Sequence, residues 1–135
     1  MKQLIKLSII AAISVALPMT SCKKYDEGPG FSLASKKSRV DGTWKIERAT
    51  YSGTDITSEF EGVEWTMKKD GTFNLLIDGT TETGKWEFLT DKTILEFVFN
   101  DGSIEKYTIK RLTNKELWIE LDDFGDILEF RLAAK

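Results

Sequence analysis

Asp41-Gly42-Thr43-Trp44 marks the point at which the character of the sequence changes. Before it, residues 23–40 form an 18-residue polar segment, and before that lies an apolar leader. After it, apolar and polar residues alternate with a period of two, as they do in half-buried β-strands. We therefore expect the folded domain to span residues 41–135, and the preceding residues to serve export and attachment.

The composition is that of one soluble globular domain, and it excludes several kinds of site. The chain has 135 residues, 41% apolar and 30% charged, with no His and a single Cys. An internal disulfide, a His/Cys metal site and a His-dependent triad are therefore excluded. Without residues 1–21, the chain keeps 17 basic and 22 acidic residues, a net charge of −5 that argues against nucleic acid. We expect no cofactor, no metal and no enzymatic activity.

Residues 1–21 have the pattern of a secretory signal peptide. Lys2 and Lys6 precede an apolar run over residues 7–17, which as a helix would rise about 16 Å, roughly half of a bilayer core. The run is followed by Met19-Thr20-Ser21-Cys22, which resembles the lipobox of bacterial lipoproteins, with Met in place of the usual Leu. The resemblance implies that Cys22 is acylated and anchors an outer-membrane lipoprotein, either periplasmic or surface-exposed.

Residues 22–40 are predicted to form a flexible tether that buries little. Gly28, Pro29 and Gly30 break regular structure, and an 18-residue coil would span roughly 25 Å. The mixed charge directly after Cys22 resembles the export signal of surface lipoproteins of the Bacteroidota. A plain solvated linker is the alternative, so surface display stays open.

The alternating region predicts eight strands with hairpin connections. Turn signals such as Asp70-Gly71 and Asp78-Gly79 separate them, and residues 56–60 have the length of a single helical turn. A sheet of this size with one apolar face is stabilised by closing on itself. We therefore predict an all-β fold, an eight-stranded antiparallel up-and-down barrel, with strands at 43–52, 63–68, 72–77, 81–89, 93–99, 103–111, 116–121 and 126–132.

The order and spacing of several short motifs resemble the lipocalin-like lipoproteins of the Bacteroidota. Gly42-Thr43-Trp44 resembles the opening motif of the lipocalins, and the other pieces are Asp70-Gly71-Thr72-Phe73, Gly84-Lys85-Trp86 and Leu112-Thr113-Asn114-Lys115-Glu116-Leu117. The resemblance implies a calycin-type barrel without known enzyme activity. In lipocalins an Arg near the end of the last strand packs across the opening Trp, which implies that Arg131, or alternatively Arg111, stacks on Trp44.

The candidate ligand contacts are all aromatic, and they are Tyr51, Phe60, Trp65, Phe73, Trp86, Phe97 and Tyr107. They either line a pocket or fill the interior, since eight strands enclose about enough space for their own side chains. Short strands favour a mostly filled interior. We expect a monomer that binds a small apolar or amphipathic ligand. The alternative is a filled barrel that presents loops to another protein. Trp118 lies on the polar face and receives no role.

Charge is predicted to separate along the barrel axis. The up-and-down topology places Asp78, Asp101, Asp122 and Asp123 at the end far from the tether, while Lys and Arg gather beside it. The basic end would suit anionic head groups, and the acidic mouth would attract a cationic ligand or a basic protein partner. The alternative is that Asp is common in turns because its carboxylate accepts backbone hydrogen bonds.

The position of Cys22 gives a direct test of anchorage. Labelled fatty acid should enter the wild-type protein and should not enter Cys22→Ala, because Cys22 is the sole thiol of the chain. Membrane fractionation with label incorporation is the measurement. A Cys22→Ala variant that still takes up label and still partitions with membranes would contradict the lipoprotein interpretation.

Overall fold

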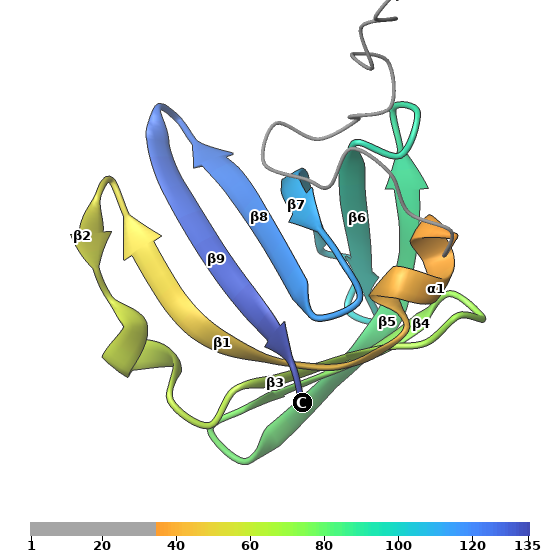
Figure 1. Cartoon of the computed structure of the whole chain (residues 1–135). Helices are drawn as coiled ribbons and strands as arrows, with labels where there is room; N and C mark the ends of the chain where they lie inside the picture. The colour runs from red at the N-terminus through yellow and green to blue at the C-terminus, as the bar shows by residue number, and fades with distance from the viewer. Residues whose placement is uncertain (1–34) are drawn as a thin grey trace, which may run out of the picture.

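Alternation gives the sheet one apolar face, and in the computed structural model, which describes residues 35–135, that sheet closes on itself (Figure 1). The predicted signal peptide, Cys22 and residues 22–34 of the predicted tether lie outside the described residues. No helix within residues 35–135 is long and apolar enough to cross a membrane.

The eight predicted strands correspond to β1 and to β3 through β9, with ends that agree within two residues. The helical turn expected over residues 56–60 is present as the 3-10 helix η1, and the two-residue strand β2 is an addition. In chain order the elements are α1 (Lys36–Val40), β1 (Gly42–Tyr51), β2 (Thr54–Asp55), η1 (Thr57–Phe60), β3 (Glu64–Met67), β4 (Thr72–Ile77), β5 (Thr80–Leu89), β6 (Ile94–Phe99), β7 (Ile104–Leu112), β8 (Glu116–Asp123) and β9 (Asp126–Ala134).

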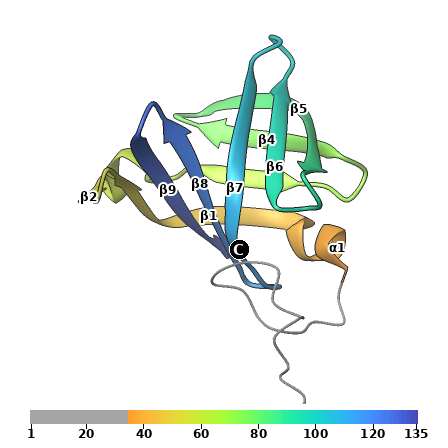
Figure 2. The same cartoon turned by 90° about the horizontal axis from the view of Figure 1, so that it is seen from above.

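Closure comes from the pairing of the last strand with the first. Consecutive strands from β3 to β9 pair antiparallel, and β9 then pairs with β1 from Trp44↔Ala134 to Tyr51↔Leu128. Figure 2 shows β9 alongside β1, as this register requires. The predicted eight-stranded up-and-down barrel is therefore confirmed.

The pairing of β1 is unequal on its two sides. Its other edge pairs with β3 only over Gly42–Lys45, and beyond Lys45 that edge is covered by η1 and β2 (Figure 1). The backbone wall is therefore interrupted between the second half of β1 and β3. This interruption positions the site described below.

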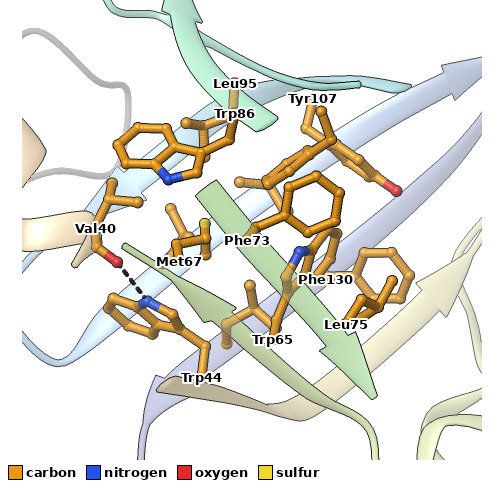
Figure 3. Close-up of a cluster of buried hydrophobic side chains, with 14 of the residues drawn as sticks. Val40, Trp44, Trp65, Met67, Phe73, Leu75, Trp86, Leu95, Tyr107 and Phe130 are labelled. Atoms are coloured by element: carbon orange, nitrogen blue, oxygen red, sulfur yellow. Dashed lines mark hydrogen bonds between the residues drawn. The ribbon is translucent and has the colours of Figure 1, made fainter. Parts of the chain in front are cut away.

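Aromatic packing fills the central part of the barrel (Figure 3). Phe97 is fully buried, with its ring centroid 4.8 Å from that of Trp65 and 5.2 Å from that of Phe73. Such tilted and edge-to-face contacts between rings stabilise the core beyond their apolar burial. Gly84 allows this closeness, because a Cβ atom there would lie 2.1 Å from the Val98 carbonyl oxygen and 2.8 Å from Phe73 Cε1.

Residues 36–40 differ from the sequence expectation of a tether that buries little. They form the short helix α1, capped by Ser35 Oγ, which accepts from Ser38 N at 3.1 Å. Arg39 and Val40 are buried, and Arg39 Nη1 donates to the Leu112 carbonyl at 3.2 Å. The Val40 carbonyl accepts from Trp44 Nε1 at 2.8 Å (Figure 3). The last turn before β1 is thus part of the barrel.

Val40→Ser tests whether α1 is structural. Val40 is completely buried, so the variant loses apolar burial and buries a hydroxyl, and the free energy of unfolding should fall by about 2 kcal/mol or more. Lys37→Ala, at an exposed position of the same helix, is the matched control and should change it by less than about 0.5 kcal/mol. Urea unfolding followed by Trp fluorescence measures both. Equal stability of the two variants would show that α1 does not contribute to the folded barrel and belongs to the tether.

Candidate functional site

The end of the barrel opposite α1 is called the mouth here. It carries the turns between β1 and β2, β4 and β5, β6 and β7, and β8 and β9. At the mouth, η1 covers the gap between β1 and β3 and places the Phe60 ring 5.0 Å from the Phe130 ring, edge to face. Phe60 therefore closes the side of the barrel that backbone hydrogen bonds leave open.

Beneath Phe60 lies a cavity of about 190 Å³. Its volume is below the roughly 300–1,000 Å³ of pockets for drug-sized ligands, but above the roughly 150 Å³ of an apolar cavity that holds benzene. The space therefore suits a molecule with one ring and a short substituent. Its lining is apolar apart from one carboxylate and two aromatic polar groups, and consists of Ile46, Phe60, Val63, Trp65, Leu75, Ile77, Glu105, Tyr107, Leu128 and Phe130.

Aromatic rings form much of the cavity wall. The centroid of Trp65 lies 5.7 Å from that of Tyr107 and 6.3 Å from that of Phe130, both edge to face. Tyr107 and Phe130 are 6.2 Å apart in a tilted arrangement. These side chains come from β3, β7 and β9, so the up-and-down topology brings together residues that are far apart in the chain (Figure 3).

Glu105 supplies the charge at this site. Along β7, the alternation of Glu105, Tyr107 and Ile109 places the Glu105 side chain on the inner face. Tyr107 Oη donates to Glu105 Oε2 at 2.7 Å. Burial, reinforced by this carboxylate, raises the pKa of Tyr107 far above its usual value, so its hydroxyl remains a neutral donor at physiological pH.

Trp65 carries an unsatisfied donor. Its Nε1 atom is buried and has no hydrogen-bond partner among residues 35–135. Leaving a buried donor unpaired costs roughly 1–3 kcal/mol. A bound molecule with an acceptor atom within reach would remove this cost.

A groove of about 360 Å³ lies outside the barrel wall beside η1. Ile46, Phe60 and Val63 line both the groove and the cavity, so they form the partition between them. Few backbone bonds hold η1 to the barrel; one joins Ile56 N to the Ala49 carbonyl at 2.9 Å. A shift of Phe60 with η1 would therefore connect the two spaces without breaking the β1–β3 ladder.

The sequence profile of the lipocalin-like domain matches residues 40–119, more than half of the chain. The chain belongs to the lipocalin-like domain family. The solution structure of a protein from Bacteroides uniformis ATCC 8492 has the same fold, with a TM-score of 0.53 and 19% identity over 73% of this chain and 90% of that chain. A search of curated proteins finds no match. Lipocalin-like proteins are generally non-enzymatic binding proteins, and the fold suggests a ligand-binding type of function.

The lipocalin-like barrel separates the seven candidate ligand contacts into three groups. Phe60, Trp65 and Tyr107 line the cavity. Phe73, Phe97 and Trp86 pack in the filled part of the interior. Tyr51 is exposed at the mouth, where its hydroxyl lies 3.3 Å from Asp126 Oδ2 and 3.4 Å from Asp123 Oδ2. Desolvation, followed by these two carboxylates, raises the pKa of Tyr51.

Glu105 is absent from the residues predicted to bind a ligand. The signal for it was present, because strict alternation from Tyr107 places Glu105 on the apolar face. The prediction considered aromatic residues alone, so it also missed the aliphatic residues that line the cavity, which are Ile46, Val63, Leu75, Ile77 and Leu128.

The expected stacking of Arg131, or of Arg111, on Trp44 is wrong. Arg131 faces outward, opposite Arg48 in the β1–β9 register, whereas Trp44 faces inward opposite Ala134. Instead the Arg131 guanidinium lies 4.1 Å from the Trp118 ring centroid, and that of Arg111 lies 5.3 Å from it.

Trp118 thereby receives a structural role. Arg111, Trp118 and Arg131 are direct neighbours across β7, β8 and β9, with the indole between two guanidinium groups. Glu129 Oε1 accepts from Arg131 Nε at 2.7 Å, and Glu116 Oε1 accepts from Arg111 Nη2 at 3.2 Å. Cation–π contact and charge pairing therefore hold three strands together on the outer face.

The four Asp residues predicted at the mouth lie in or beside its turns. Asp101 accepts from Ser103 N and Oγ, and these hydrogen bonds lower the pKa of Asp101. Asp122 accepts from Gly125 N at 2.7 Å, and Asp78 adopts a positive φ of 48° in its turn. Turn chemistry thus accounts for Asp101 and Asp122. No group of three or more potential ligand side chains within residues 35–135 is placed to hold a metal ion.

Proposed function

We propose that this chain is a non-enzymatic binding protein of the cell envelope, which holds a small apolar or amphipathic molecule in the cavity beneath Phe60. The observation that carries the proposal is the cavity of about 190 Å³ with its apolar lining. A fully packed interior would leave no such space, because protein cores contain few voids larger than a water molecule.

Two features favour an amphipathic molecule over a pure hydrocarbon. Glu105 places a carboxylate at the wall, and Trp65 Nε1 is an unpaired donor among the described residues. Polar groups that are few and fixed in position give orientation in sites that are otherwise apolar. The groove beside η1 supplies the route of access, with Phe60 as the movable partition.

Membrane attachment is the second part of the proposal. Cys22 after Met19-Thr20-Ser21 supports an acylated outer-membrane lipoprotein, facing the periplasm or the cell surface. Lys36 and Lys37 belong to α1, at the end of the barrel that residues 22–34 lead into, and Lys135 lies at the same end. Basic side chains near an anionic surface contribute about 1 kcal/mol each. The mouth would then face away from the bilayer.

A second candidate function is the presentation of the mouth to a basic protein. The observation that favours it is Phe124, which is fully exposed at the tip of the β8–β9 turn and adopts a positive φ of 53°. A bulky residue in this conformation is uncommon, and Asp122, Asp123 and Asp126 surround it in the chain. Asp or Gly would suit the turn better, so a contact made by Phe124 would explain its presence.

Leu128→Trp tests the cavity. Leu128 lines the cavity, so a larger side chain should occupy the space and weaken the binding of toluene and propylbenzene at least about tenfold, or 1.4 kcal/mol. Ile127→Trp is the matched control, since Ile127 is exposed and on the other face of the same strand. Protein-observed NMR titration gives the affinities and locates the shifts.

The wild type and Ile127→Trp should show shifts centred on Phe60, Trp65 and Phe130. Absence of binding to the wild type, or equal binding to Leu128→Trp, would remove the cavity as a site. Specific binding of a basic protein that is lost in Phe124→Ala would favour the second candidate.

A further inference from the structure

We propose that the cavity is selective for a small amine, whose protonated nitrogen is held between the Glu105 carboxylate and the faces of the surrounding aromatic rings. This inference rests on the proposed function and specifies the class of its ligand. An arylalkylamine, with one ring and a chain of two or three carbons, fits the volume, the carboxylate and the rings, and an acceptor on its ring, such as a phenol oxygen, would also pair with Trp65 Nε1.

Glu105 supplies the negative charge that would bind an ammonium group. It is the one charged side chain among the described residues that line the cavity, and no Lys or Arg is among them. An ionised carboxylate offers about four lone-pair positions, and the hydrogen bond from Tyr107 Oη uses one. The remaining acceptor capacity suits an ammonium group, which carries only donors and the opposite charge.

Aromatic rings supply further attraction for a cation. Phe60, Trp65, Tyr107 and Phe130 line the same small space, with neighbouring centroids between 5.0 and 6.3 Å apart. Ring faces carry negative charge density and attract a desolvated cation, which is how aromatic cages bind ammonium groups. A carboxylate combined with several rings therefore disfavours anions and neutral polar molecules, and favours an amine with an apolar body.

The negative charge of the mouth also favours a cationic ligand. Asp101 lies in a turn at this end of the barrel, Asp122 and Asp123 end β8 there, and Asp126 begins β9. Although hydrogen bonds to the turns account for some of these positions, the carboxylates still produce a negative potential around the opening. Cations would be concentrated at the mouth and anions repelled from it, before any contact with Glu105.

Isothermal titration at pH 7 with three compounds of similar shape tests the inference. The probes are 2-phenylethylamine as the cation, propylbenzene as the neutral isostere and 3-phenylpropionate as the anion. The wild type should bind the amine at least about tenfold more tightly than propylbenzene, which corresponds to about 1.4 kcal/mol. It should bind 3-phenylpropionate more weakly than either.

Glu105→Gln removes the charge and keeps the size and an acceptor for Tyr107. It should abolish the preference for the amine over propylbenzene, and a near-ultraviolet circular dichroism spectrum like that of the wild type reports that the barrel is folded. Glu87→Gln is the matched control, since it makes the same change at an exposed position of β5 and should retain the preference.

Three results would overturn the inference, and they separate it from the function on which it rests. If propylbenzene binds in the cavity and the amine binds no better, the cavity is a site but not an amine site. If the amine is preferred equally by Glu105→Gln, the recognition lies elsewhere. If none of the three compounds binds, the inference and the proposed function both fail.

Discussion

The hydrogen bonds between β1 and β9 are the constraint on which the rest of this structure depends. They close eight strands into a barrel, and closure fixes the interior at about the volume of the side chains that point into it. Among the described residues, the buried core consists of eight aromatic side chains and eleven other apolar ones, which an open sheet would not force into contact. Within a closed wall they must pack at the density of a crystal, with Phe97 at the centre against Trp65 and Phe73.

One consequence of closure concerns β1 itself. β1 pairs with β9 from Trp44 to Tyr51, whereas its other edge pairs with β3 over only four residues, so the chain between β1 and β3 must cover the remaining gap. η1 does so with a single aromatic side chain, Phe60, and few backbone hydrogen bonds. The cavity lies at this gap, where η1 covers the wall in place of regular strand pairing. Besides Phe60, η1 is held to β1 by Thr57, whose Oγ1 accepts from Ala49 N at 3.0 Å, so the wall beside the candidate site depends on side chains where the rest of the barrel has strand pairing.

Period-two alternation was sufficient to predict the strands, the closure and most of the buried face, because all side chains on the apolar face become buried when the sheet closes. Trp65 and Phe97 follow from it directly. The same alternation places Arg131 on the outer face. The expectation that Arg131 would reach Trp44 came from the resemblance to lipocalins, and it disagreed with the alternation of this chain. The actual partner of Arg131 is Trp118, its direct cross-strand neighbour. Predicting this contact would have required the register between β8 and β9.

Other features depend on quantities that a linear pattern does not contain. α1 has five residues, too few for helical periodicity to appear, so its packing against Trp44 and Leu112 emerges only in three dimensions. The cavity volume is a difference between the space enclosed and the volume of the side chains, and neither is given by alternation. The alternation places the Glu105 side chain on the inner face. A single polar residue on an apolar face indicates a binding site only once the cavity beside it is known.

The proposed function requires an accessible apolar space beneath Phe60 in a barrel that is otherwise filled. A crystal of the mature protein under xenon pressure tests it most directly, because xenon occupies dry apolar cavities without specific chemistry. We expect a xenon atom in contact with Phe60, Trp65 and Phe130. A site without xenon, occupied by side chains or by water hydrogen-bonded to Glu105 and Trp65 Nε1, would contradict it.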